Sequence, residues 1–192
     1  MEIDEERLKT YVKRRINEER YVHSVNTAAE AEALARQYGV DIQKARIAGL
    51  LHDVGKGHAA DAANYGIVFD DIEALNPELA HGRIGAAMVR TDLGIDDPEI
   101  LSAITSHTTG KPCMSPLDKV IYLADIIEPG RTFTGVEQIR ALAWANIDAA
   151  MICALDEIMA FVRKRGLTLH PKSMEAYQYL KEREEQKKFG LS

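Results

Sequence analysis

The sequence contains very little cysteine and no long apolar run. Its two cysteines, Cys113 and Cys153, lie far apart and form no Cys-x-x-Cys pair, which argues against a disulfide framework and a cysteine-based structural zinc site. We predict that both are free thiols in a reducing compartment. No apolar run approaches the roughly 18 residues that a membrane-spanning helix needs, so we expect no membrane partner.

Positive charge is also in deficit. The 192-residue chain carries a net charge of −6, which argues against a general nucleic-acid binder. A small polyanionic partner stays open, because a local basic cluster or a bound metal can reverse the field at one site. The first residues, Met1 to Glu6, are acidic and lack the apolar segment of a secretory signal, so we expect a cytoplasmic protein.

Strand signals are missing as well: no convincing strand pair, hairpin dipeptide, internal repeat or low-complexity linker occurs. Almost every segment instead repeats its apolar residues at the helical period. The pattern predicts helices over residues 5–20, 21–38, 41–55, 70–75, 81–93, 97–107 and 115–127, one over 135–165 bent near 146–148, and a last helix from about 171. We expect one all-α domain over residues 1–192, with its core at about 21–180 and a charged tail at about 181–192.

A His-Asp pair stands at the end of an apolar helical pattern, in the run Leu51-His52-Asp53-Val54-Gly55-Lys56. Burying an ionised carboxylate beside apolar residues is unfavourable unless a partner compensates. A metal ion is a suitable partner, because imidazole and carboxylate both bind metals in the forms that they hold at neutral pH. Such a pair also arises by chance, so its value as evidence for a metal site depends on whether further ligands occur in the sequence.

Four more residues can complete a ligand set: His23, His81, His107 and Asp125. With His52 and Asp53 they make four imidazoles and two carboxylates, enough for two first-row metals that share a carboxylate. This donor set suits iron, manganese, zinc or nickel. Each residue also has an ordinary interpretation: a single helical His is usually a surface or hydrogen-bonded residue, and Asp125 shares a stripe with Asp118 and Tyr122 that can be a solvated face.

The order of these residues resembles the HD superfamily of metal-dependent phosphohydrolases and, more narrowly, the YqeK family. The resemblance spans about residues 21–179 and rests on His23, Leu51–Lys56, His81-Gly82, His107-Thr108-Thr109-Gly110 and Leu123-Ala124-Asp125-Ile126-Ile127-Glu128-Pro129-Gly130-Arg131. It implies a single HD-domain helical bundle with two metal ions, most often iron, and symmetrical cleavage of diadenosine tetraphosphate to two ADP. His23, His52, Asp53 and Asp125 would then hold one metal, and Asp53 would bridge to a second metal held by His81 and His107.

Candidate substrate contacts lie near these ligands in the sequence. We expect Asp53 and Lys56 to be central to catalysis. Lys56 can also contact a phosphate oxygen of the substrate, although a solvated lysine at a helix end is an equally good interpretation. Arg131 can contact a phosphate with both arms of its guanidinium. Weaker candidates for substrate binding are Arg83, Thr108, Thr109 and Lys111. Glu128 is interpreted either as a hydrogen-bonding partner of a ligand or as a helix-end carboxylate.

The remaining polar and aromatic residues receive ordinary interpretations. We expect His58 to be exposed in a loop, His170 to mark a helix start and Trp144 to lie in the core. Tyr177 and Tyr179 can offer a base-stacking surface, although ordinary packing is favoured for both.

Three other functions stay open at this point. The same centre would serve a hydrolase of another nucleotide, a two-iron oxidase that consumes dioxygen, or a regulatory domain that only binds a nucleotide. For each function that involves a nucleotide, the expected partner is a small molecule, such as a dinucleoside polyphosphate or a nucleoside diphosphate product. The apolar late helices also allow a homodimer.

Overall fold

The computed structural model describes residues 4–190, and those residues contain helices but no strand. The α-helices are α1 (Glu5–Arg15), α2 (Glu18–Tyr38), α3 (Ile42–Leu51), α4 (Asp71–Leu75), α5 (His81–Leu93), α6 (Pro98–Ser106), α7 (Pro116–Ile127), α8 (Val136–Ala145), α9 (Ile147–Lys164) and α10 (Pro171–Lys188), with 3-10 helices η1 (Ala59–Tyr65) and η2 (Pro77–Ala80). The all-α prediction is therefore confirmed. None of the described helices is both long and apolar enough to cross a bilayer.

Side-chain caps explain where several helices begin. Asp41 accepts the backbone N–H of Lys44 at the start of α3, and Ser115 and Asp118 form a reciprocal capping box at the start of α7. Gly39 ends α2 in the left-handed conformation with φ of 66°. Because such caps satisfy backbone groups locally, most helix boundaries agree with the sequence pattern.

The structure corrects several predicted boundaries. The first helix ends at Arg15, because Asn17 adopts an extended conformation and its side chain caps α2 by accepting the N–H of Arg20. The predicted bend near residue 146 is a break, where extended Asn146 ends α8 and caps α9. α3 stops at Leu51, so the His-Asp pair lies in the turns that follow. α10 continues through the charged tail to Lys188, and η1 is a helix that the sequence pattern did not indicate.

Two single-residue predictions are also wrong. Trp144 is 43% exposed, because it lies in the last turn of α8 just before the break. His58 is largely covered and bridges two segments: its Nδ1 lies 2.9 Å from the Asp61 carboxylate and its Nε2 lies 2.9 Å from the Arg15 carbonyl. His170 marks a helix start as expected, since it caps α10, and both cysteines are free.

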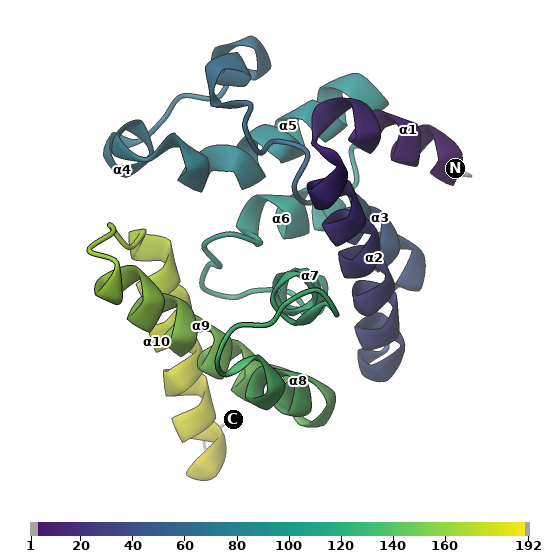
Figure 1. Cartoon of the computed structure of the whole chain (residues 1–192). Helices are drawn as coiled ribbons and strands as arrows, with labels where there is room; N and C mark the ends of the chain where they lie inside the picture. Colours follow the sequence, from purple (N-terminus) through teal and green to yellow (C-terminus); the bar gives the residue numbers. More distant parts are fainter. Residues whose placement is uncertain (1–3, 191–192) are drawn as a thin grey trace.

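The apolar helix α7 occupies the centre of the fold. In Figure 1 it is seen end-on, with α2 and α3 on one side, α8 to α10 on the other, and α6 beside it. Its buried residues include Val120, Ile121, Leu123, Ala124 and Ile127. Burying this helix on all sides explains why its sequence is apolar around most of its circumference. The same burial brings its last turn, which carries Asp125, next to α2 and α3.

Two glycines allow the backbones around the His-Asp pair to approach closely. A Cβ on Gly55 would lie 2.2 Å from the His81 carbonyl oxygen and 2.4 Å from the Gly85 nitrogen. A Cβ on Gly82 would lie 2.7 Å from the Thr105 carbonyl oxygen. Neither distance leaves room for a methyl group against rigid backbone. These glycines therefore set the spacing between the pair, the start of α5 and the end of α6.

Replacing Gly55 with alanine tests this close packing. We expect Gly55→Ala to lower the free energy of unfolding by about 3 kcal/mol or more, because the new methyl group overlaps backbone atoms that cannot rotate away. The control is Gly57→Ala, where a Cβ would meet nothing within 4 Å and only the positive φ of 79° is unfavourable, at about 1 kcal/mol. Urea unfolding followed by circular dichroism measures both, and equal losses in the two variants would contradict the packing argument.

Candidate metal centre

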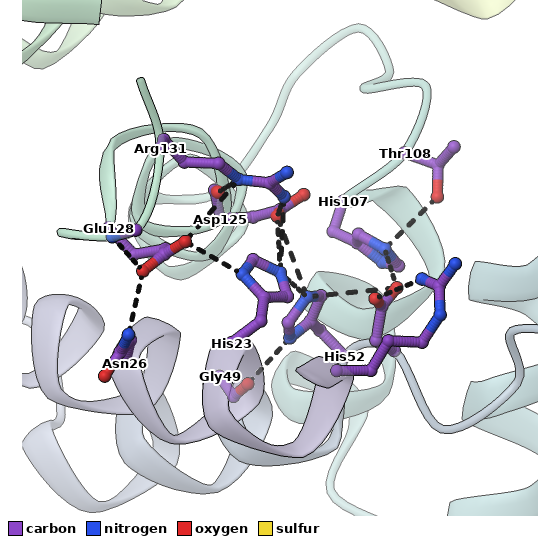
Figure 2. A network of polar contacts seen from close by, with 12 residues as sticks. His23, Asn26, Gly49, His52, His107, Thr108, Asp125, Glu128 and Arg131 are labelled. Carbon is purple, nitrogen blue, oxygen red and sulfur yellow. Dashed lines mark hydrogen bonds and ion pairs between the residues drawn. The ribbon is translucent and has the colours of Figure 1, made fainter. Parts of the chain in front are cut away.

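Five segments bring six polar side chains to one point. His23 projects from the second turn of α2, His52 and Asp53 follow α3, and Asp125 stands in the last turn of α7. The two remaining residues are His81, at the start of α5, and His107, just after α6. Figure 2 shows His23, His52, His107 and Asp125 pointing toward one another from these elements. The structure thus brings together all six residues that the sequence singled out as metal ligands.

The carboxylate oxygens and ring nitrogens form two linked groups. Asp53 Oδ1 lies 3.2 Å from His81 Nε2, 3.6 Å from His107 Nε2 and 3.9 Å from His52 Nε2. Asp125 Oδ1 lies 3.0 Å from His23 Nε2 and 3.8 Å from His52 Nε2. His52 therefore contacts both carboxylates and joins the two groups.

Hydrogen bonds aim the ring nitrogens at this point. The Nδ1 atoms of His52, His81 and His107 each lie 2.6–2.7 Å from the carbonyl oxygen three residues earlier in the chain. A carbonyl oxygen only accepts, so Nδ1 carries the proton and donates it, and Nε2 keeps a free lone pair that faces the cluster. Such a partner on the far nitrogen is the arrangement typical of metal-binding histidines.

The fourth imidazole is oriented by a carboxylate. His23 Nδ1 lies 3.2 Å from Glu128 Oε1, and the other oxygen of Glu128 accepts hydrogen bonds from Asn26 Nδ2 at 3.1 Å and from the Gly130 backbone N–H at 2.7 Å. Glu128 is only 3% exposed. Figure 2 shows Glu128 between Asn26 and His23. Of the two interpretations of Glu128, the structure favours the hydrogen-bonding partner of a cluster residue.

Burial and neighbouring groups shift the pKa values of the histidines and of Asp53 within the cluster. It lowers the pKa of the His52 imidazole to about 4 and also lowers the pKa of His81, so both rings are neutral at pH 7. Burial alone raises the pKa of the Asp53 carboxyl, but His52, His107 and His81 together outweigh burial and hold that pKa well below its usual range. Neutral imidazoles beside an ionised carboxylate are the forms that bind metals.

Asp125 does not belong to a solvated face. Its stripe neighbours Asp118 and Tyr122 are 1% and 0% exposed, and Arg131 covers Asp125 itself. The Arg131 guanidinium donates from Nη2 to Asp125 Oδ1 at 2.5 Å and from Nε to the Asp125 carbonyl at 2.9 Å. Burial raises the pKa of the Asp125 carboxyl, but the hydrogen bond with His23 and nearby charges, including Arg131, outweigh burial and lower it.

These residues fit a metal centre by their chemistry. The donors are nitrogen and oxygen alone, the ring lone pairs face inward, and subsets of the cluster converge within 4.8 Å: His23, His52 and Asp125 form one, and His52, Asp53 and His107 form another. This donor set suits first-row divalent metals.

A polar cavity opens beside the cluster. It has a volume of about 480 Å³, and its wall includes Asp53, Lys56 and Arg131. Arg20 also lines it and donates from Nη1 to Asp53 Oδ2 at 3.4 Å. Arg20 was missed in the sequence, although its position three residues before His23 places both on one face of α2. Three cations line this cavity together with the carboxylates of Glu19, Asp53 and Glu128, and the cations can donate hydrogen bonds to a phosphate chain.

The other proposed substrate contacts divide into two sets. Thr108 Oγ1 lies 3.1 Å from His81 Nε2, so its hydroxyl is at the centre. The structure does not bring the remaining three to the cavity. Arg83 is paired with Glu73, Lys111 with Ser102 and Asp118, and Thr109 donates to the Gly110 carbonyl; these three border a separate hollow of about 90 Å³.

Comparison with known proteins places this geometry in a family. The HD domain model matches residues 20–130, a range that contains all six cluster residues. The chain is 38% identical to the symmetrical bis(5'-nucleosyl)-tetraphosphatase of Bacillus subtilis, over 88% of this chain and 93% of the relative. It is 33% identical to the protein of the same name from Staphylococcus aureus, over 91% of this chain and 93% of the relative.

A solved structure agrees over nearly the whole fold. The crystal structure of a protein from Clostridium acetobutylicum, described as a predicted HD superfamily hydrolase involved in NAD metabolism, superimposes with a TM-score of 0.90 at 38% identity. The match covers 94% of this chain and 98% of that protein. From the family model and these relatives we conclude that the chain belongs to the HD domain family, whose members depend on divalent metals.

Proposed function

We propose that this protein is a metal-dependent hydrolase that cleaves diadenosine tetraphosphate symmetrically to two ADP. The observation that carries the proposal is the cluster of four imidazoles and two carboxylates beside a cavity lined by Arg20, Lys56 and Arg131. We infer the substrate from the relatives named symmetrical bis(5'-nucleosyl)-tetraphosphatase, which match most of this chain. The two free cysteines suit action in the reducing cytoplasm.

The proposal includes two metal ions, with iron as the expected metal. His23, His52, Asp53 and Asp125 would hold one ion, and Asp53 would share its carboxylate with a second ion held by His81 and His107. When bound, such a pair lowers the pKa of water, so that hydroxide is available near neutral pH. Support comes from the position of Asp53, whose Oδ1 lies closest to His81 while the separate group at Asp125 includes His23.

The chain's own residues bind and orient the substrate. A tetraphosphate chain carries several negative charges, and Arg20, Lys56 and Arg131 supply three positive charges on the wall of the same cavity. Cleavage between the second and third phosphates leaves two phosphates on each product, so the cavity must hold charge on both sides of the broken P–O bond. Thr108 adds a hydroxyl beside His81 that can donate to a phosphate oxygen.

The rival functions differ in what they consume. A screen of dinucleoside polyphosphates, deoxynucleoside triphosphates and cyclic nucleotides identifies the hydrolysed substrate. If another nucleotide is hydrolysed and diadenosine tetraphosphate releases no ADP, the proposed substrate is wrong. Full activity without dioxygen and with a redox-inert metal would exclude an oxidase. A nucleotide-binding domain without catalysis has no need for six converging donors.

Removing Asp53 tests the shared carboxylate. We expect Asp53→Ala to lower the rate of diadenosine tetraphosphate hydrolysis by at least about a thousandfold and to reduce the bound metal, because one side chain orders both parts of the cluster. The control is Asp96→Ala, whose carboxylate is exposed and pairs with Arg90. Metal analysis and hydrolysis assays measure both variants, and full metal content with wild-type activity in Asp53→Ala would contradict the proposal.

Glu128 is a positioning residue, and a near-isosteric substitution tests it. In Glu128→Gln only one oxygen remains, so the amide NH2 must face either the donors Asn26 and Gly130 or the His23 N–H. We expect a 10- to 100-fold loss of metal affinity, the range typical when a partner of a ligand is changed. Metal titration by calorimetry measures this loss.

The matched control for Glu128 is Glu137→Gln, whose side chain is 81% exposed and pairs with Arg140. It should bind metal as the wild type does. Unchanged metal affinity in Glu128→Gln would mean that Glu128 serves only the loop at Gly130.

A further inference from the structure

A second hollow adjoins the polar cavity and has a different character. It lies between α9 and the segment that follows α7, and it has a volume of about 590 Å³. Arg131 lines both the hollow and the polar cavity, so the two spaces meet at this side chain. The volume falls in the range of about 300–1,000 Å³ typical of small-molecule sites.

The walls of this hollow are mainly apolar and include two exposed aromatic rings. Phe133 and Phe161 line it and are 41% and 53% exposed, and Ile126 and Ile158 add aliphatic surface. Arg165 lies over the Phe161 ring, 5.2 Å from its centre, and so covers one face of the ring. Exposed aromatic rings beside a charged cavity are a common way to stack a nucleic-acid base.

We propose that this hollow binds the purine base of one half of the substrate, an inference that rests on the proposed function. A nucleotide has an apolar, stackable base at one end and charged phosphates at the other. The protein offers the same sequence of surfaces, with Phe133 and Phe161 in the hollow, Arg131 at the boundary and the cluster beyond it. Glu157 and Lys164, on the same wall, provide one acceptor and one donor for the edge of the base.

The opposite side of the cavity has another chemistry. A hollow of about 510 Å³ shares Arg20 and Lys56 with the cavity and is further lined by Arg15, His58 and Glu78, with no aromatic ring except the imidazole. This hollow suits the phosphates of the second half rather than a stacked base. The two identical halves of the substrate would therefore meet different surfaces, and only one base would be stacked on aromatic rings.

The binding of ADP and of inorganic pyrophosphate to the metal-containing protein separates the base from the phosphates. We expect Phe161→Ala to weaken ADP binding by about tenfold, a typical effect of losing one stacking ring, and to leave pyrophosphate binding within twofold. The KM for diadenosine tetraphosphate should rise by a similar factor. The control is Phe189→Ala at the end of α10, a phenylalanine that is 77% exposed against 53% for Phe161 and lines none of these spaces, so it should change the binding of neither ADP nor pyrophosphate.

The outcomes are distinguishable. If the wild type hydrolyses diadenosine tetraphosphate but Phe161→Ala and Phe133→Ala bind ADP as the wild type does, the base site is overturned and the proposed function stands. If the wild type does not hydrolyse it, yet both variants bind ADP more weakly and pyrophosphate as the wild type does, the proposed function fails and the base site is supported. A dimer in sedimentation that the Phe161→Ala variant dissociates, with the ratio of ADP to pyrophosphate affinity unchanged, would make the hollow an interface between copies and overturn the inference.

Discussion

Two carboxylates, the buried Asp53 and the largely covered Asp125, lie among four imidazoles, and the orientation of those rings determines what this cluster can bind. At His52, His81 and His107 a backbone carbonyl accepts the Nδ1 proton, and at His23 the Glu128 carboxylate does so. The rings of His52, His81 and His107 therefore turn their unprotonated nitrogens inward, while the inward nitrogen of His23 lies 3.0 Å from the Asp125 carboxylate. The inward lone pairs and the ionised carboxylates repel one another unless a cation lies among them, so the hydrogen bonds that orient the rings also create the demand for a metal.

The rest of the fold maintains this arrangement. The buried helix α7 holds Asp125 against α2 and α3, and the glycines at positions 55 and 82 let the turns and helix ends that carry His52, His81 and His107 approach within side-chain reach. Helix ends serve this purpose well, because their carbonyls and adjoining turns remain free to hold side chains that an internal helical turn would direct elsewhere. The cationic cavity and the aromatic hollow then lie on either side of Arg131.

Much of the site was predictable from residue type and order. The six cluster residues and Arg131 are readable from the sequence, because metal ligands must be imidazole or carboxylate and because the surrounding runs resemble a known family. Arg20 was not predicted, although it shares a helical face with His23, since nothing in a charged stretch separates a site arginine from a solvated one. Arg83 and Lys111 follow ligands in the sequence yet turn toward Glu73 and Asp118, because proximity along a chain does not fix the direction of a side chain.

The sequence by itself determined the helical class, most helix starts and the identity of the cluster residues, because periodicity, caps and ligand chemistry are local properties. Only the tertiary structure decided that Asp125 is covered rather than solvated, that the His-Asp pair lies beyond the end of α3, and that Glu128 orients His23 across 105 positions of the chain. These outcomes depend on the distances and angles between packed helices, which arise from side chains that meet only in the folded core.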